Sequence, residues 1–346
     1  MKAKAAILTG LKAPLVIDEV AVPEPAFGQV LVKIRYSGLC GSQLGEIDGA
    51  KGPDRFLPHL LGHEGSGVVL RAGPGVKTLK EGDHVVLHWR KGAGLESKTP
   101  TYEWKGAPLN AGWVTTFNEL AIVSENRATV IPQDFDLRLA SLLGCAVITG
   151  MGIVANDAKV QRGESVVVFG AGGVGLNVLQ AAALAGAAPI VAIDLTDHKL
   201  ALAKAFGATH AINSRTESAR KAVLRAVGAK GANVVIDNTG VSGVIELSYE
   251  LTHPQGRTIL VGVPKNGERV SIDTLPLHFG KILTGSHGGE AEPALDIPRC
   301  LGLFGEGRLK LGEMITDTFP LDGINDAVAS LRAGKIAGRA VIEVSK

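Results

Sequence analysis

Cysteine is scarce in this sequence, with only Cys40, Cys145 and Cys300 among 346 residues. An odd and widely spaced set does not form a disulfide framework, so each thiol is left with a place in an apolar core, metal ligation or catalysis. Charge of one sign is also absent, because 36 basic and 34 acidic residues leave a net charge of +2. This balance favours neither nucleic acid nor an anionic membrane as a partner.

Long hydrophobic runs are missing as well. The longest weakly polar run, 140–155, is short for a bilayer span and includes Ser141, Thr149 and three glycines. The N-terminal segment MKAKAAILTG has too short an apolar patch for a signal peptide. We therefore expect a soluble, cytoplasmic protein without a membrane partner. What is plentiful is glycine, with 45 residues, which is typical of tight strand-to-helix turns and close backbone packing.

The pattern of short runs changes near residue 136. Before it, alternating stretches such as 30–34 and 67–70 are separated by turn signals such as Gly73-Pro74-Gly75, which predicts a β-rich domain. After it, a helical region over 136–156 leads into alternating strands and helices. The predicted strands are 164–169, 189–194, 234–237 and 258–262, and the predicted helices include one reaching about 185 and one at 198–206.

Strand–helix alternation predicts an α/β doubly wound parallel sheet with helices on both faces. The pattern loosens after about residue 286 and ends on a strand-like run over 339–344. We therefore predict one domain from residues 1–148 and 287–346, with the doubly wound domain, 149–286, inserted into it.

A glycine-rich turn follows the first predicted strand of the doubly wound domain. Gly170-Ala171-Gly172-Gly173-Val174-Gly175 fits G-x-G-x-x-G between a strand and a helix, which is the context a dinucleotide site requires. Gly170 allows the tight turn, Gly172 lets the backbone approach a pyrophosphate, and Gly175 lets the helix pack closely on the strand. The pyrophosphate would meet the positive end of the helix dipole.

Asp194 ends the next predicted strand and indicates which dinucleotide is bound. A carboxylate there accepts hydrogen bonds from the ribose hydroxyls of NAD and repels the 2′-phosphate of NADP. The next residues, Leu195 and Thr196, include no arginine to hold such a phosphate. We therefore predict NAD as the cofactor.

Three candidate metal ligands lie far apart in the chain. Cys40 lies in Gly-Leu-Cys-Gly-Ser, His63 in Leu-Gly-His-Glu-Gly, and Cys145 in Leu-Gly-Cys-Ala. Spacing alone leaves each as a possible core residue, because none follows a zinc-finger pattern. The order of these segments, followed by G-x-G-x-x-G, resembles the zinc-dependent alcohol dehydrogenases of the medium-chain dehydrogenase/reductase superfamily over essentially the whole chain.

The resemblance implies a β-rich GroES-like catalytic domain and a Rossmann domain. It implies that Cys40, His63 and Cys145 hold one catalytic Zn2+, with one position left open for substrate. The implied activity is hydride transfer between an alcohol and the C4 atom of the NAD nicotinamide, giving an aldehyde or ketone. Ser42 matches the position that hands off the alcohol proton, and Glu64 matches an acid near the metal that supports zinc or exchanges with water.

Further cofactor contacts are implied by the same resemblance. Thr149 and Val174 match residues beside the nicotinamide, and Lys199 matches one near the adenine ribose. Val263 matches a strand end whose backbone meets the carboxamide, and Arg339 matches an arginine that binds the pyrophosphate.

The sequence departs from the family in the loop that follows His88. Many relatives have a four-cysteine structural zinc lobe there, but residues 89–112 contain no cysteine, so we predict one zinc per subunit. Trp89 matches an apolar position in the substrate pocket, although filling the core is an equal alternative. Arg90 and Lys91 are read as a solvated pair, with contact to an anionic substrate as the alternative.

Two further departures lie beside the predicted ligands. Gln43 stands where most relatives have an aspartate that orients the zinc-bound histidine, so the imidazole is predicted to be a weaker donor. Gly45 stands where some relatives continue the proton relay with a histidine. His59 and His84 are other possible proton acceptors without an assigned place.

Two other readings compete with a zinc alcohol dehydrogenase. One is a zinc-free reductase of the same superfamily that acts on enones or quinones, and the other is a non-catalytic NAD-binding regulatory protein. The complete set of predicted ligands, with Ser42 and Glu64, argues against both. The substrate stays open among primary or secondary alcohols, polyols and acid-bearing alcohols. A homodimer or homotetramer is expected.

Overall fold

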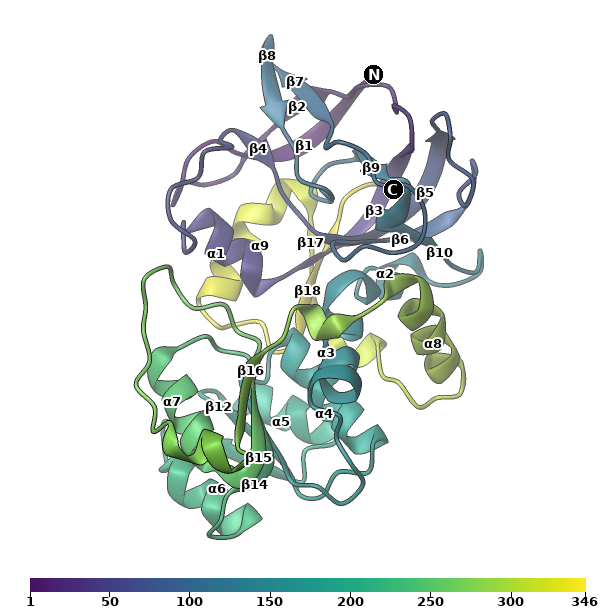
Figure 1. The fold of residues 1–346 in the computed structure, drawn as a ribbon. Coiled ribbons are helices and arrows are strands. Elements are labelled where there is room, and N and C mark those ends of the chain that lie inside the picture. The colour runs from purple at the N-terminus through teal and green to yellow at the C-terminus, as the bar shows by residue number, and fades with distance from the viewer. The chain divides into compact units, whose positions relative to one another are not determined.

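The computed structural model describes all 346 residues, and the chain divides into two compact units (Figure 1). Unit 1 comprises Met1–Cys145, Glu292–Glu306 and Leu311–Lys346, and unit 2 comprises Ala146–Ala291 and Gly307–Lys310. Unit 2 therefore interrupts unit 1 in the sequence. The functional domain limits expected at 148/149 and 286/287 stay a prediction.

Unit 1 is built on two β-sheets, as the alternating runs predicted. A small closed barrel has the order β1 (Lys2–Leu8), β2 (Val16–Ala21), β7 (Thr101–Trp104), β8 (Ala107–Asn110), β4 (His59–Leu60). The larger sheet has the order β10 (Ala128–Val130), β6 (His84–His88), β5 (Glu64–Ala72), β3 (Gln29–Leu39), β18 (Arg339–Glu343), β17 (Ile315–Pro320), and β9 (Leu120–Ser124) also pairs with β3. Valine, isoleucine and leucine side chains from these strands fill the core of the unit.

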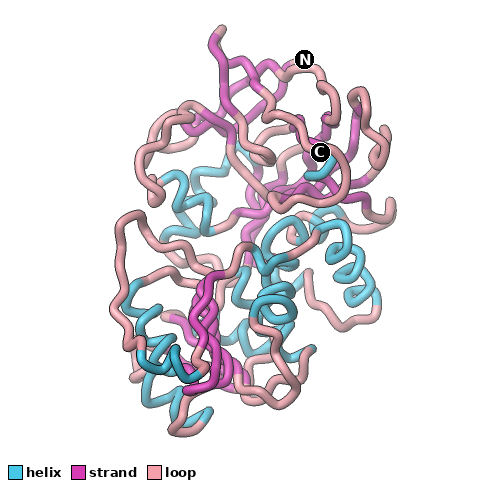
Figure 2. Tube along the Cα trace, in the orientation of Figure 1, coloured by secondary structure: helices cyan, strands magenta, loops and turns pink.

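Unit 1 also contains α-helices, drawn in cyan with the other helices in Figure 2. They are α1 (Gly41–Ile47), α2 (Leu137–Ala140), α8 (Pro293–Gly305) and α9 (Ile324–Arg332). Helix α8 was not expected, because the pattern loosens after residue 286. It begins with Pro293 at its first position, where a missing N–H leaves no hydrogen bond unmade.

Unit 2 has the doubly wound architecture that the sequence predicted. Its parallel sheet has the order β13 (His210–Asn213), β12 (Ile190–Asp194), β11 (Val166–Phe169), β14 (Ala232–Asp237), β15 (Thr252–Leu260), β16 (Ile282–Gly285). The helices of this unit include α3 (Ile148–Gly152), α4 (Gly173–Leu184), α5 (Asp197–Ala205), α6 (Ala219–Val227) and α7 (Ser242–Leu251). The strand order reverses between β11 and β14, and ligands of such sheets bind at this switch point.

Two stretches of the chain differ from the sequence-based prediction or add detail to it. Strand β15 ends at Leu260, so the Val263 segment lies beyond the strand and the Val263 side chain is exposed. Leu137–Asp157 is a helical stretch long and apolar enough to cross a membrane, but 83% of its apolar window is buried inside the protein. Burial of that extent identifies a core helix.

Candidate metal centre and nucleotide site

Three segments of unit 1 bring their ligand-type side chains together. Cys40 follows β3 and forms the N-cap of α1, and His63 immediately precedes β5. Strands β3 and β5 pair antiparallel, with Ser37 opposite Gly65, so the end of one meets the start of the other. Cys145 lies on a π-helical turn, Leu143–Val147.

The resulting cluster fits a zinc ion. The ligand atoms of Cys40, His63 and Cys145 all lie within 4.8 Å of one another, and the two cysteines are buried. Two thiols and one imidazole are ligands that zinc prefers, and a three-residue set leaves the fourth tetrahedral position open. Cys300 takes no part: it is buried on α8, and burial raises the pKa of its thiol to about 12.

The two thiols of the cluster are hydrogen-bonded to each other. A hydrogen bond from the Cys145 thiol lowers the pKa of Cys40 well below its usual value, and Arg339 and His63 act in the same direction. The same hydrogen bond, together with burial, raises the pKa of Cys145. The cluster therefore stabilises one thiolate even before a cation adds its own charge.

Gly62 sets the backbone that presents His63. Its φ is +93°, and a Cβ atom there would lie 2.3 Å from Oγ1 of Thr116. The carbonyl of the preceding Leu61 accepts the backbone N–H groups of both Thr116 and Phe117. Only glycine fits this tight crossing, so the residue before the histidine is fixed by packing.

Gln43 contacts two parts of the same centre. Its Oε1 accepts the backbone N–H of Cys40 at 3.0 Å, and its Nε2 contacts Nδ1 of His63. The side chain is 1% exposed. The residue thus occupies the orienting place that the sequence assigned to it.

Glu64 is fully buried beside the cluster and pairs with Arg339 of β18. Arg339 is 4% exposed, and its Nε has no hydrogen-bond partner in the protein. The arginine expected to bind the pyrophosphate is therefore held by an acid next to the metal ligand His63.

The groups considered for proton transfer have different surroundings. Ser42, in the first turn of α1, is exposed, and Gly45 in the same helix offers no side chain to continue a relay. His59 is buried and bonded at both ring nitrogens, to Asp54 at 2.8 Å and to the carbonyl of Leu60 at 2.9 Å. His59 is therefore a structural residue in this fold.

Trp89 directly follows strand β6. His88, the last residue of β6, pairs with Glu64, the first residue of β5 and the neighbour of His63. The Arg90 guanidinium lies 5.9 Å from the centre of the Trp89 ring, and Lys91 pairs with Glu96. The two cations are engaged within their own loop.

The cysteine-free loop is held by two buried charges that sequence reasoning missed. Arg127 contacts the carbonyl of Trp89, pairs with Glu96 at 2.8 Å and lies 4.9 Å from the ring centre of Trp113. Glu125 accepts backbone N–H groups of the loop and of the segment near Lys77. Nothing in the Glu-Asn-Arg triplet marks it as buried, because charged residues are usually exposed.

The glycine-rich turn of unit 2 has the geometry expected of it. Gly170 has a φ of +87°, and a Cβ on Gly175 would lie 2.0 Å from the Gly170 carbonyl oxygen. Gly172 caps α4, and a Cβ there would meet only open space, while Gly173 is the first residue of the helix. Val174 is half-buried in the first turn of α4. The helix N-terminus is therefore open to an anionic group.

The remaining cofactor candidates lie at separate places in unit 2. Asp194 ends β12, and its carboxylate accepts the N–H of Ala171 in the glycine-rich turn at 2.9 Å. Lys199 is half-buried on α5, and Val263 is 64% exposed beyond β15. Thr149 is buried on α3, and its hydroxyl has no partner in the protein.

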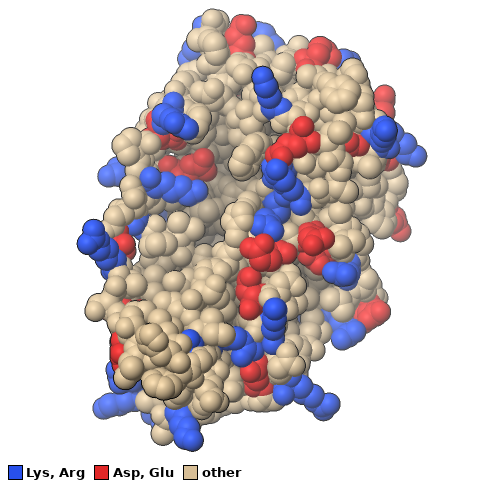
Figure 3. Space-filling model, viewed as in Figure 1, with Lys and Arg blue, Asp and Glu red and all other residues tan.

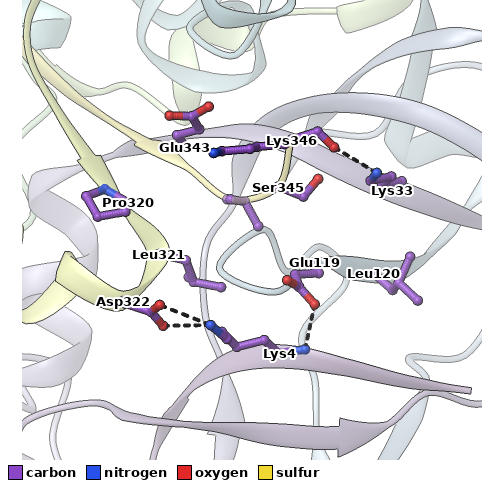
Figure 4. Close-up of a pocket in the computed structure, with 11 residues that line it drawn as sticks. Lys4, Lys33, Glu119, Leu120, Pro320, Leu321, Asp322, Glu343, Ser345 and Lys346 are labelled. Carbon is purple, nitrogen blue, oxygen red and sulfur yellow. Dashed lines mark hydrogen bonds and ion pairs between the residues drawn. The ribbon is translucent and has the colours of Figure 1, made fainter.

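A separate hollow on unit 1 lies near the C-terminus (Figure 4). It has a volume of about 530 Å³, and both of the lysine side chains described next have partners within it. Lys4 pairs with Asp322 at 3.0 Å, and Lys33 donates to the Lys346 carbonyl at 2.8 Å. The hollow holds no metal-ligating set.

A β-rich unit with a two-thiol, one-imidazole cluster and a doubly wound unit with a glycine-rich turn define a metal-dependent dehydrogenase. Residues 26–133 match the alcohol dehydrogenase GroES-like domain family, and residues 173–301 match the zinc-binding dehydrogenase family. S-(hydroxymethyl)glutathione dehydrogenase of Paracoccus denitrificans is 32% identical, covering 97% of this chain and 98% of that protein. The protein of the same name from Escherichia coli O6:H1 is 33% identical, with the same coverage.

Solved structures agree with these sequence relatives. An alcohol dehydrogenase zinc-binding domain protein from Burkholderia ambifaria superposes with a TM-score of 0.90 at 30% identity, covering all of both chains. Benzyl alcohol dehydrogenase of Acinetobacter calcoaceticus gives a TM-score of 0.90 at 29% identity with the same coverage. The chain belongs to the zinc-type medium-chain alcohol dehydrogenases. It is an NAD-dependent enzyme that interconverts an alcohol and a carbonyl compound, as the sequence predicted.

Proposed function

We propose that Cys40, His63 and Cys145 hold the single catalytic zinc of this dehydrogenase. The observation that carries this proposal is the convergence of three ligand atoms, from three distant segments, within 4.8 Å. Zinc bound there supplies a Lewis acid that makes an alcohol hydroxyl acidic near neutral pH. Metal analysis of the purified protein tests the proposal: one zinc per chain is expected, and Cys40→Ser should lose both zinc and turnover while keeping NAD binding.

Ser42 is proposed to accept the proton that the alcohol releases. Its hydroxyl lies two residues from Cys40 and is exposed, so it can pass the proton directly to water. Gly45 provides no further relay group, which makes this route short. Ser42→Ala should lower kcat by about 10²-fold or more, within the range of lost acid–base catalysis, while zinc content stays the same.

Glu64 is proposed to act through position and charge. It follows His63 directly, is excluded from solvent and is fixed by Arg339. An acid held this way places a negative charge beside the cluster and can support the metal or exchange as a ligand with water. Glu64→Gln keeps the shape and removes the charge, so a changed kcat with retained zinc would support the role.

The cofactor NAD, which accepts the hydride, is proposed to bind at the glycine-rich turn of unit 2. Gly172 leaves open space at the start of α4, Gly170 lies in the turn before it, and Gly173 and Gly175 lie in the first turn of the helix. Asp194 is already bonded to this turn through Ala171, which supports a place beside the ribose. Asp194→Gly should weaken NAD binding and raise relative use of NADP, and unchanged preference would contradict the assignment.

Each of the other cofactor contacts is proposed on a single observation. Thr149 is supported by a buried hydroxyl without a partner, and Arg339 by its unpartnered Nε. Val174, Lys199 and Val263 rest on their places near the ends of α4, α5 and β15. Thr149→Val should raise KM for NAD if the hydroxyl binds the cofactor, and no change would remove it from the set.

We propose an aromatic or other apolar primary alcohol as the preferred substrate. Trp89 follows His88, which pairs with Glu64 beside His63, while Arg90 and Lys91 have partners in their own loop. One structural relative acts on benzyl alcohol, and sequence relatives act on S-(hydroxymethyl)glutathione. Comparing kcat/KM for benzyl alcohol and S-hydroxymethylglutathione tests the choice. A clear preference for the glutathione adduct would contradict it.

We propose that the protein forms a homodimer through the free edge of β16, with a homotetramer as the larger possibility. β16 is an edge strand, bonded only to β15, and the apolar side chains of Leu275, Phe279 and Ile282 around it are exposed. Light scattering should give twice the chain mass or more for the wild type and a smaller species for Ile282→Lys. Phe27→Lys changes an exposed apolar residue of unit 1 and is the matched control.

A small-molecule substrate, rather than a nucleic acid or membrane, also agrees with the surface. Lys and Arg are interspersed with Asp and Glu on the face in Figure 3, so no field of one sign forms there. We propose the cytoplasm as the compartment, because all three cysteines are free and a thiol-ligated metal requires reduced sulfur. Fractionation of the cells that make the protein tests this.

A further inference from the structure

Lys281 is a buried lysine of unit 2 that no acidic side chain neutralises. It directly precedes β16 and is 7% exposed. Its Nζ has no hydrogen-bond or ion-pair partner in the protein and lies 4.2 Å from the ring centre of Tyr249 on α7. An aromatic face attracts an ammonium group but accepts no ordinary hydrogen bond from it. A lysine buried to this extent is usually paired, so its place requires an explanation.

The acidic side chains closest to Lys281 are bonded to other groups. Asp273 accepts the backbone N–H of Leu275 at 3.0 Å, and Glu246 accepts the backbone N–H of Ser271 at 2.7 Å. Burial lowers the pKa of Lys281 below its usual value of 10.5, and the charge of Asp273 opposes this effect only in part. The ε-amino group therefore loses its proton more readily than that of an exposed lysine.

Lys281 also lines a hollow on unit 2. The hollow has a volume of about 480 Å³, and Leu247, Ile272 and Pro276 give it apolar walls. A space of this size accommodates a small organic molecule. A lysine that is easily deprotonated is a nucleophile toward carbonyl carbon, and carbonyl compounds are what this enzyme forms from alcohols.

We propose that Lys281 is a site of covalent modification by small aldehydes, including those that alcohol oxidation by this enzyme yields. The lone pair of Nζ adds to the carbonyl carbon, so that a C–N bond forms and the C=O π bond breaks. The resulting carbinolamine loses water and leaves an imine, and the step consumes neither an oxidant nor a reductant. Lys281 belongs to unit 2, whereas the proposed zinc ligands belong to unit 1, so the reaction needs no zinc.

Reductive trapping compares all lysines in one experiment. The purified protein, in the oligomer that it forms, is incubated near neutral pH with benzaldehyde and cyanoborohydride, which converts each imine into a stable benzylamine. Peptide mass spectrometry then gives the labelling rate of each lysine. Lys281 should be labelled about tenfold faster or more than the exposed Lys221 and Lys230. Labelling of Lys281 at their rate or more slowly overturns the proposal.

Asp273 gives a test of the cause. Asp273→Asn keeps an oxygen for the N–H of Leu275 and removes the negative charge that favours the protonated form of Lys281. Labelling of Lys281 should therefore become faster by about twofold or more. Glu313→Gln removes an exposed acid of unit 1 and should leave the rate unchanged. Equal labelling of Lys281 in the wild type and in Asp273→Asn contradicts the proposal.

Lys281→Arg identifies the reactive group in the intact protein. It keeps a positive charge at this position, but a guanidinium group stays protonated and forms no imine under these conditions. The first benzyl group should therefore be added about tenfold more slowly than in the wild type. A variant that gains its first label as fast as the wild type would show that another lysine is the reactive one. Because no NAD is added and no turnover occurs, failure of the proposed zinc ligation would leave these results unchanged.

Discussion

Arg339 pairs with Glu64 where both side chains are closed off from solvent, at 4% and 0% exposure. Glu64 directly follows the metal ligand His63, and Arg339 begins β18, which pairs with the end of β3 just before Cys40. The pair therefore ties the last strand of unit 1 to the two segments that carry the first two ligands.

Removing one partner of this pair should destabilise unit 1 strongly. Arg339→Met leaves the Glu64 carboxylate buried without a counter-charge, which typically costs about 3–5 kcal/mol. Urea unfolding measures the loss. The double variant Glu64→Leu/Arg339→Met removes both charges and should recover much of the stability. An Arg339→Met protein as stable as the wild type would show that the pair contributes nothing.

The cysteine-free loop should depend on Arg127 rather than on metal. Arg127→Met removes the bonds to Trp89 and Glu96 and the contact with Trp113, so amide exchange over 89–97 should accelerate while the rest of unit 1 stays protected. A chelator that removes zinc should leave exchange in this loop unchanged. Lys91→Met, which removes an exposed pair with the same Glu96, is the control and should have little effect.

Glu125 should contribute stability that disappears in acid. Burial alone would raise the pKa of Glu125, but three backbone N–H groups and the Thr78 hydroxyl lower it to about 2 from 4.5. Since the folded carboxyl holds its proton less tightly, its contribution is present above pH 4.5 and is lost as the pH falls through about 2. Glu125→Gln should flatten this part of the stability profile. Identical profiles for the two proteins would contradict the assignment.

His88 should act at milder acidity. Burial lowers the pKa of His88 from 6.5 to about 4, while its ring is bonded to the Arg90 carbonyl and to Thr129. The unfolded chain therefore binds the proton first, and stability should fall between pH 6.5 and 4, by up to about 3 kcal/mol. Subtracting the profile of His88→Gln from that of the wild type isolates the effect, and a flat difference would refute it.

Local patterns were enough to predict four of the six strands of the doubly wound sheet, but not β13 and β16. The strands Val166–Phe169 and Ile190–Asp194 lie within two residues of their predicted limits, because buried parallel strands are continuous apolar runs. β15 was predicted only from residue 258, although it begins at Thr252. Its first half, Thr-His-Pro-Gln-Gly, has the composition of a turn, and within it only Thr252 has a partner in the sheet, Ala232.

For the site too, the sequence predicted some features, and others depend on tertiary contacts. The three ligands were found through motif order, but their approach to one another depends on the pairing of β3 with β5 and on a π-helical turn at Cys145. The sequence placed Gln43 beside His63, but its second contact, with the backbone N–H of Cys40, is known only from the folded chain. The burial of Arg127 and Glu125 could not be predicted. Charged residues are usually exposed, and no local pattern in the sequence marks these two as exceptions.

X-ray absorption at the zinc K-edge of the purified enzyme tests the central claim most directly. With a single metal cluster per chain, every zinc atom reports the same site. The spectrum should show two sulfur ligands at about 2.3 Å and nitrogen or oxygen ligands at about 2.0–2.1 Å, with one zinc per chain. Four sulfur ligands, no sulfur ligand, or a protein without zinc would contradict ligation by Cys40, His63 and Cys145.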